Sequence, residues 1–360
     1  MIPISIPYLY KEDKRYAIKA IKDNFIGQGP NILEFEKKVA SLSGREFAVT
    51  CSNGTTALYM ALKTLDLPKG SEVILPSMTI ISCLTAIIEN NLKPIFCDVD
   101  PNTWNIDFNS VKNKITSNTS ALIIVNTYGL MINPKELQDF KIQYPNIKII
   151  EDASEAHGAY YNGKVAGSLG DISTFSFYSN KIVATGEGGA VMTDDIELYE
   201  KLLLIRNLNF IERKKYIHSD IGWNFRMSNL ACSIGVGQIE NINKTIKDRV
   251  RIQKRYNKHF YSCSEIQTPF EPFGGQNVCW YYAILIKNNK YNNLLEELNK
   301  NQIDYRHFFY PLHKQPFIES KDTLEISEYL YKQGIILPTY TGLKNKDIDF
   351  ICKIVLNSIL

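Results

Sequence analysis

The chain of 360 residues lacks a marked excess of charge of one sign, long apolar runs and a signal-peptide pattern. Lys and Arg (41) nearly balance Asp and Glu (38), and the two signs are interspersed, so the charge pattern predicts binding neither to nucleic acid nor to membrane surfaces. Apolar runs such as residues 121–125 are far shorter than the roughly 20 residues that cross a bilayer. Residues 1–8 lack the basic and apolar regions of a secretory signal peptide. We therefore expect a cytoplasmic protein.

The cysteines also exclude some kinds of site. The chain has seven, without a Cys-x-x-Cys pair or a repeating spacing, which predicts reduced and mostly buried thiols rather than disulfides or zinc ligands. We expect no metal site. The hydrophobic fraction of 44% is that of a globular chain, and the length corresponds to about two domains.

Short β-branched runs alternate with helical patterns between residues 45 and about 195. The predicted helices include residues 79–91 and 134–141. The runs lack strict polar alternation, which is typical of parallel strands covered on both faces. We therefore predict an α/β fold with a mainly parallel, doubly wound sheet. The expected strands cover residues 72–75, 94–98, 121–125, 147–150, 172–177 and 189–192.

The pattern changes after Asn224. Residues 227–261 predict a helix, interrupted near Gly235 and Gly237. A smaller C-terminal α/β domain is expected to follow, so we place the domains at residues 1–235 and 236–360. Its predicted elements are a strand at 278–286, a helix at 291–300, a strand at 303–309 and a helix at 344–360.

Three motifs contain residues that could carry chemistry. In the first, Gly54 and Thr55 precede a helical pattern. A Gly-Thr-Thr turn at a helix N-terminus offers free N–H groups and hydroxyls to a phosphate. The alternative is an ordinary helix cap.

The second motif follows the apolar run at 147–150. Asp152 follows this strand directly, at the sheet edge where open α/β sheets bind ligands, and Glu155, three residues on, could share that site. Asp152 could equally cap the next helix. We expect His157 to be a packed or surface histidine rather than a base, because nothing in the sequence marks a partner for it.

The third motif is Lys181, which follows an apolar strand and precedes a glycine-rich turn. Most lysines are solvated surface residues. A partly desolvated amine has a lowered pKa, however, and becomes a nucleophile toward carbonyls. Together with a phosphate cradle and a carboxylate, such a lysine meets the requirements of pyridoxal phosphate. The lysine forms an imine with it, and the acid keeps its ring nitrogen protonated.

At these residues the chain resembles the DegT/DnrJ/EryC1/StrS family of sugar aminotransferases. The similarity covers nearly the whole chain, and the serine, the asparagine-lysine pair and the Thr-Gly-Glu-Gly-Gly turn stand in the family's spacing. The motifs that carry it lie at residues 25–30, 53–58, 151–156, 175–189, 221–229, 309–313 and 337–343.

The resemblance implies a type I, aspartate aminotransferase-like fold, bound pyridoxal 5′-phosphate, and amino transfer from L-glutamate to C4 of a nucleotide-linked 4-keto-6-deoxyhexose. It implies a homodimer with shared active sites, in which Asn224 and possibly Arg226 reach the phosphate of the neighbouring subunit. Lys181 and Asp152 would be catalytic. The further cofactor-binding residues would be Gly54, Thr55, Ile80, Glu155 and Ser176, and the substrate-binding residues Tyr128, Arg226, Tyr216, His218 and His313, with Tyr216 and His218 in the stretch 215–218.

One departure and three alternatives accompany the resemblance. Ile80 stands where relatives have an aromatic residue stacked on the pyridoxal ring, and an aliphatic residue forfeits roughly 0.5–1.5 kcal/mol of stacking energy.

Some relatives dehydrate a 4-keto sugar at C3, but they carry histidine in place of the lysine. The presence of Lys181 therefore argues against dehydration. A small keto phosphate, in place of the sugar, is an alternative acceptor of the amino group. A non-catalytic regulator would predict a lost lysine or carboxylate, and both are present.

Overall fold

The computed structural model describes residues 1–211 and 216–360. Within this part of the chain the largest sheet has seven strands, in the order β1-β9-β8-β5-β4-β2-β3. β8, β5, β4, β2 and β3 run parallel to one another, whereas β9 is antiparallel to both β8 and β1. The expectation of a mainly parallel sheet is therefore confirmed, and β1 is an addition. The strands are β1 (Phe47–Cys51), β2 (Glu72–Pro76), β3 (Lys93–Cys97), β4 (Thr119–Val125), β5 (Lys148–Asp152), β8 (Ile172–Ser176) and β9 (Gly189–Thr193).

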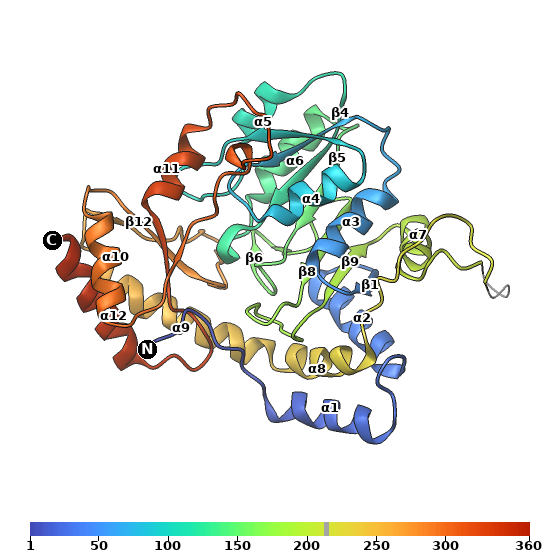
Figure 1. Cartoon of the computed structure of the whole chain (residues 1–360), viewed down its shortest axis with the longest axis horizontal. Helices are drawn as coiled ribbons and strands as arrows, with labels where there is room; N and C mark the ends of the chain where they lie inside the picture. Colours follow the sequence, from blue (N-terminus) through green and yellow to red (C-terminus); the bar gives the residue numbers. More distant parts are fainter. Residues whose placement is uncertain (212–215) are drawn as a thin grey trace.

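Helices cover both faces of this sheet (Figure 1). Buried residues of α3, α4 and α7 form a core with one set of alternating strand residues, and residues of α2, α5, α6 and α8 pack on the other set. Because both faces are buried, the strands carry apolar residues toward both layers of helices and lack strict polar alternation. These helices are α2 (Pro30–Ser43), α3 (Gly54–Thr64), α4 (Ile81–Glu89), α5 (Phe108–Lys114), α6 (Pro134–Gln143), α7 (Ile196–Arg206) and α8 (Asn229–Glu240), and α1 (Lys11–Lys22) packs on α8.

A smaller antiparallel sheet forms the C-terminal part, in the order β10-β12-β14-β13. Its strands are β10 (Ile266–Gln267), β12 (Tyr282–Ile286), β13 (Arg306–His307) and β14 (Gly334–Leu337). Its helices are α9 (Ile242–Phe260), α10 (Tyr291–Lys300), α11 (Glu325–Gln333) and α12 (Asn345–Ile359). The strands predicted at 278–286 and 303–309 are thus shorter than expected. The remaining elements are β6 (Tyr160–Tyr161), β7 (Lys164–Val165), β11 (Gly275–Gln276), η1 (Thr127–Gly129) and η2 (Leu312–Lys314).

The long helix predicted at 227–261 breaks at a different place from the one expected. The break between α8 and α9 falls at Asn241, and Gly235 and Gly237 lie inside α8. A Cβ at Gly235 would stand 2.5 Å from the Phe35 ring, and one at Gly237 would stand 2.4 Å from an Asp13 oxygen. These glycines therefore allow α1 and α2 to approach α8 closely, and they do not end it.

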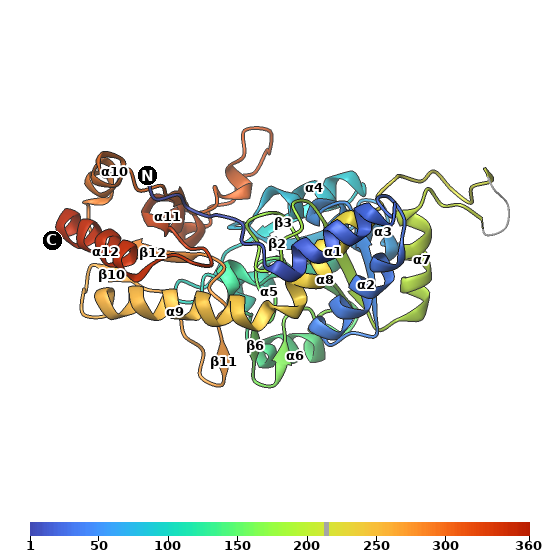
Figure 2. The same cartoon turned by 90° about the horizontal axis from the view of Figure 1, so that it is seen from below.

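The N-terminus joins the C-terminal part of the fold (Figures 1 and 2). Ile2 forms a parallel bridge with Ile303, and the Ile4 amide donates to Asp304 at 3.1 Å. Helix α8 packs against α1 and α2, whereas α9 packs against α12. The domain boundary placed after residue 235 remains a prediction. The chain leaves the helices packed on the large sheet and enters those of the C-terminal part near Asn241.

Candidate active site

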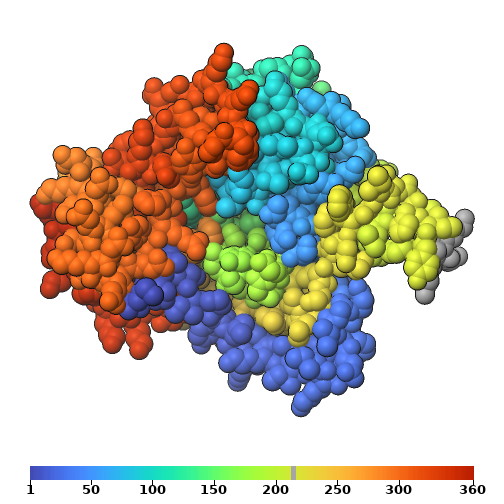
Figure 3. Space-filling model, in the orientation of Figure 1, coloured from blue at the N-terminus to red at the C-terminus, as the bar shows by residue number. Residues whose placement is uncertain are grey.

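The ends of neighbouring parallel strands bring the predicted site residues to one edge of the large sheet. β5 ends at Asp152, and it pairs in parallel with β8, which ends at Ser176. Lys181 follows in the loop after β8. Because parallel strands end at the same edge, residues distant in sequence meet there. In Figure 3 the surface is hollowed where the segment around residue 180 meets the C-terminal part.

Lys181 lies in a largely enclosed position. Its Nζ is 3.9 Å from Oε1 of Glu155 and 3.8 Å from the centroid of the Trp280 ring, and its side chain is 11% exposed. Burial lowers the pKa of Lys181, while Glu155 and Asp152 oppose that shift. The lowered pKa favours the neutral amine, which is the nucleophilic form.

Glu155 is held from two sides. Its Oε2 accepts a hydrogen bond of 2.7 Å from the backbone N–H of Tyr128, and its Oε1 faces Lys181. Burial raises the pKa of Glu155 to about 7, while the positive charge of Lys181 and the Tyr128 amide oppose the rise. The carboxyl group therefore changes charge near neutral pH, next to the amine.

Asp152 is nearly fully buried at the end of β5. Its Oδ1 accepts from the Ser154 amide at 3.1 Å, and its Oδ2 lies 3.5 Å from Sγ of Cys83, a weak donor on α4. Two polar contacts fix the orientation of the carboxylate. It is therefore preorganised as a hydrogen-bond acceptor.

The start of α3 forms a polar cradle beside Ser176. Asn53 caps the helix by accepting from the Thr56 amide at 2.8 Å, which leaves Gly54 and Thr55 in the first turn. A Cβ on Gly54 would lie 2.7 Å from Cβ of Ser176, so only glycine allows this approach. The cap and the phosphate cradle, posed as alternatives for this motif, are compatible, because the cap occupies one N–H and the first turn offers others.

A second helix begins at the same place. The Thr55 hydroxyl lies 2.7 Å from the hydroxyl of Ser82, in the first turn of α4. Ile80 is the N-cap residue of α4 and is 41% exposed. An exposed side chain there leaves room for the predicted contact with a ring, which stays a prediction.

Tyr128 contributes its backbone rather than an accessible ring. It has a left-handed backbone (φ 52°), which aims its N–H at Glu155. Its side chain is buried among aromatic residues, with ring centroids at 5.6 Å from Phe309 and 6.4 Å from Trp280. The ring is thus enclosed by aromatic neighbours, and the contact with the sugar expected of Tyr128 stays a prediction.

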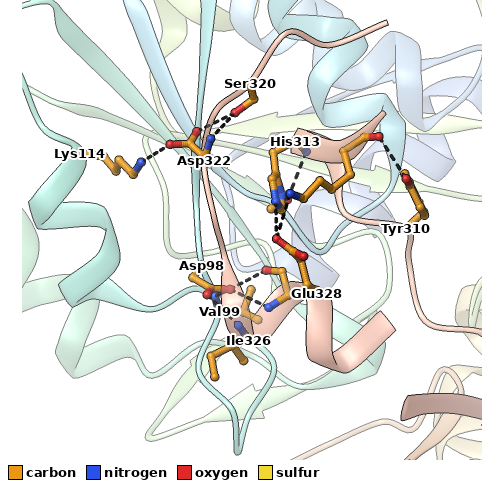
Figure 4. A network of polar contacts seen from close by, with 12 residues as sticks. Asp98, Val99, Lys114, Tyr310, His313, Ser320, Asp322, Ile326 and Glu328 are labelled. Carbon is orange, nitrogen blue, oxygen red and sulfur yellow. Dashed lines mark hydrogen bonds and ion pairs between the residues drawn. The ribbon is translucent and has the colours of Figure 1, made fainter. Parts of the chain in front are cut away.

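His313 is likewise enclosed, in the polar network of Figure 4. Its Nδ1 shares a hydrogen bond of 2.6 Å with the Ser77 hydroxyl, and its Nε2 lies 3.3 Å from Glu328. The ring has no exposed surface. Both nitrogens already have partners, and the substrate contact expected of His313 stays a prediction. The residue joins the C-terminal part to the end of β2.

The remaining predicted residues lie on the segment between α7 and α8, which is drawn in yellow at the right of Figure 1. We call its described residues, 207–211 and 216–228, the extension. Arg226 donates to Oδ1 of Asn207 at 2.6 Å, and the backbone of Asn224 forms a bridge with the same residue. His218 shares a hydrogen bond of 2.7 Å with the Leu208 carbonyl, and Tyr216 is 83% exposed. Within the described part of this chain, these contacts do not bring the four side chains to Lys181. Residue 215 lies outside the described residues.

Some site residues have no signal in the sequence. The ring of Trp280 and the thiol of Cys83 meet the site from distant segments, and no motif marks either of them. His157 packs as expected, with ring centroids 4.5 Å from Phe175 and 5.7 Å from Phe177. Burial lowers the pKa of His157 to about 3, so the ring is neutral.

Neither a membrane-spanning helix nor a metal-binding cluster is found among the described residues. Among residues 1–211 and 216–360, no helix combines the length and apolar character of a membrane span. In the same part of the chain, no group of three or more His, Cys, Asp or Glu side chains has the arrangement of a metal site.

The residues present fit pyridoxal phosphate. The cradle of Gly54, Thr55 and Ser176 suits a phosphate, Asp152 is a buried acceptor, and Lys181 is an enclosed amine. An apolar binding site would not place two carboxyl groups and an amine together away from water.

Comparison with known proteins gives an independent line of evidence. Residues 7–356 match the model of the DegT/DnrJ/EryC1/StrS aminotransferase family. The chain is 35% identical to GDP-perosamine synthase of Escherichia coli O157:H7, over 98% of this chain and 97% of that protein.

Solved structures share the fold. Helicobacter pylori PseC, an aminotransferase involved in the biosynthesis of pseudaminic acid, matches with a TM-score of 0.94 and 24% identity, over 99% of each chain. The E. coli GDP-4-keto-6-deoxy-D-mannose-3-dehydratase with bound hydrated pyridoxal phosphate matches with a TM-score of 0.93 and 24% identity, also over 99% of each chain. The fold is thus common to enzymes with two different reactions.

Proposed function

The chain belongs to the DegT/DnrJ/EryC1/StrS aminotransferase family and is a pyridoxal phosphate-dependent transaminase, and we propose that it transfers an amino group from L-glutamate to C4 of a nucleotide-linked 4-keto-6-deoxyhexose. The observation that carries this proposal is the position of Lys181, with Glu155 at 3.9 Å and Asp152 at the end of the adjacent strand. The predictions of family, fold class and cofactor are confirmed.

The cofactor supplies a carbonyl that bonds to amines and a ring that withdraws electrons from the bond beside that nitrogen. Asp152 would hold the ring nitrogen through its preorganised carboxylate. Gly54, Thr55 and Ser176 would hold the phosphate, and Glu155 would stand beside the ring hydroxyl. Lys181 would first hold the cofactor through Nζ. Once free, the same nitrogen would carry a proton between the two carbon atoms that exchange the amino group.

The lysine favours amino transfer over dehydration. The dehydratases of this fold carry histidine at the position of Lys181, and an imidazole cannot form the same link to the cofactor. A lysine can form the link and move the proton, and transamination requires both. The fold itself does not separate the two reactions.

For the substrate we propose GDP-4-keto-6-deoxymannose, with GDP-perosamine as the product. The support is the similarity to GDP-perosamine synthase over almost the whole length of both chains. The product would be a 4-amino-4,6-dideoxyhexose suited to a surface polysaccharide such as an O-antigen.

A panel of acceptors tests the substrate. With L-glutamate as donor, we expect amino transfer at C4 and the highest kcat/KM for the GDP-linked 4-keto sugar, compared with dTDP- and UDP-linked 4-keto sugars and small keto phosphates. Mass spectrometry and NMR of the product would identify the position of the amino group. A higher kcat/KM for a dTDP- or UDP-linked sugar would show that GDP is not the nucleotide of the substrate. Turnover of a keto phosphate alone, or a product deoxygenated at C3, would contradict the proposed reaction.

We also propose a homodimer with shared active sites. The extension that carries Asn224 and Arg226 exposes Ile221 and Trp223 (83% and 55%), and large apolar side chains on a projecting segment are suited to burial against a second copy. In this arrangement Asn224 and Arg226 would serve the partner's cofactor phosphate. Tyr216 and His218 would face the partner's substrate.

Mixing two inactive variants tests the shared sites. Lys181→Ala and the double variant Asn224→Ala/Arg226→Ala should each have little activity alone. After exchange of subunits we expect recovery to about a quarter of the wild-type activity, because half of the dimers would be hybrids with one intact site. Assays of each variant mixed with itself provide the control. No recovery, with hybrids demonstrated by native mass spectrometry, would show that the extension does not serve the partner's site.

A further inference from the structure

We infer that Trp280 is a positioning residue for the reactive lysine: its indole ring supports the free ε-ammonium of Lys181, and its ring N–H fixes the backbone beside that lysine. The inference rests on the proposal that Lys181 carries the reaction. It concerns the lysine whenever its nitrogen is not bonded to the cofactor.

The first support is the position of the ammonium group over the ring. Nζ of Lys181 lies 3.8 Å from the centroid of the Trp280 ring, well inside the roughly 6 Å within which a cation is attracted to an aromatic face. Tryptophan is the most favourable ring for this contact. Trp280 is 5% exposed, and desolvation strengthens the attraction.

The second support is a pair of hydrogen bonds to the residue before the lysine. Nε1 of Trp280 donates to the Asn180 carbonyl at 2.9 Å, and Nδ2 of Asn180 donates to the hydroxyl of Tyr281 at 3.2 Å. Two successive residues thus hold both the backbone and the side chain of Asn180. The loop after β8 cannot shift without breaking these bonds.

Trp280 is itself anchored between the two parts of the fold. It directly precedes Tyr281 and β12 of the smaller sheet, and its carbonyl accepts from the buried guanidinium of Arg249 at 3.2 Å. On the other side, a Cβ added to Gly129 would lie 2.9 Å from the backbone nitrogen of Trp280. The backbone of Trp280 is therefore held from both sides, and its ring packs against Tyr281, with the ring centroids 4.4 Å apart.

Such a support has a use in a reaction that repeatedly releases the lysine. A free lysine side chain has many rotamers, and each must be lost before Nζ can take a proton from a substrate carbon. An ammonium held over Trp280 and near Glu155 stays within the site. The indole has no basic nitrogen, and its N–H is bonded to the Asn180 carbonyl, so the ring holds the charge without competing in proton transfer.

The charges around Lys181 determine the sign of the expected effect. Burial disfavours the ammonium form of Lys181 and lowers its pKa, whereas Glu155 and Asp152 favour that form, and the Cys83 thiol adds to them only when it is ionised. His157 is neutral because burial lowers its pKa to about 3. The face of the indole ring also favours the cation, so weakening that face should lower the pKa of Lys181.

Fluorinated tryptophan tests this directly in the full-length protein after removal of the cofactor. Fluorine withdraws electrons from the ring and weakens cation binding with little change in shape. The pH dependence of labelling of Lys181 by trace acetic anhydride, measured by mass spectrometry, reports its pKa, with the exposed Lys11 as internal reference. We expect the labelling midpoint of Lys181 to move to lower pH with each added fluorine. The total change should be about tenfold in proton affinity.

The control is the same series in Trp280→Phe, where Trp104 and Trp223 still carry fluorine. No fluorine-dependent change in Lys181 labelling is expected there. An unchanged midpoint in the fluorinated wild-type protein, or an equal change in the Trp280→Phe series, would overturn the inference. Labelling needs neither glutamate nor a sugar, so this result is separate from the proposed reaction, whose lysine is tested by cofactor attachment.

Discussion

Lys181→Ala is expected to abolish the covalent attachment of pyridoxal phosphate and to reduce amino transfer by about 10⁴-fold or more. The variant loses both the nucleophile that bonds to the cofactor and the group that moves the proton, and a general base alone contributes about 10²–10⁴-fold. The visible absorption band of the linked cofactor should disappear. After borohydride reduction of the wild-type protein, peptide mass spectrometry should place the cofactor on the peptide that contains Lys181.

Lys181→Arg is the matched variant. It keeps a cation that can lie over Trp280 and near Glu155, so folding and thermal stability should remain close to those of the wild-type protein, but a guanidinium does not form the link. Covalent attachment should be lost here as well. Normal attachment in either variant would identify another lysine as the nucleophile, and the proposed site would then be wrong.

Asp152→Asn is expected to retain measurable cofactor binding but to lower kcat by at least about a hundredfold, the size of effect seen when one charged or hydrogen-bonding partner of a reacting group is lost. Asparagine has nearly the same shape as aspartate. It has no negative charge to favour the protonated ring nitrogen, so the ring withdraws electrons less well. Single-turnover measurements with L-glutamate alone would locate the loss in the first half of the reaction.

The control is Asp171→Asn. Asp171 is also a carboxylate that accepts from a backbone amide, that of Ile149 at 2.7 Å, but it lies before β8, at the opposite edge of the sheet. We expect a loss of stability there, with normal chemistry in the folded fraction. A near wild-type rate in Asp152→Asn would remove Asp152 from the mechanism.

Part of the candidate site is predictable because its residues lie in local motifs at strand ends. Asp152 and Lys181 each follow an apolar run, and Gly54 begins a helix pattern. Parallel strands end at one edge, so the order of runs along the chain is enough to place Asp152 and Lys181 together. Gly54 reaches the same edge through β1, a strand that the sequence analysis does not predict. Their chemical types then suggest the cofactor.

The rest depends on contacts that have no local pattern. Trp280 reaches Lys181 from a segment about 100 residues away. In the sequence it stands in an apolar run, where nothing distinguishes it from a core residue. The backbone N–H of Tyr128 holds Glu155 only because that residue adopts φ 52°, which side-chain identity does not reveal. His313 stands in a motif of the family, yet its packing against Ser77 and Glu328 encloses it.

The sequence by itself determined the alternation of strands and helices, the type of sheet and the chemical groups at its edge, since these follow from hydrophobic periodicity and from short motifs. Only the tertiary structure decided which side chains face the lysine, where α8 ends, that His313 is buried, and that Asn224 and Arg226 pair with Asn207 beside the ends of β1 and α7. The reason is physical: such contacts join residues far apart in the chain, and packing across elements, rather than local preference, selects them.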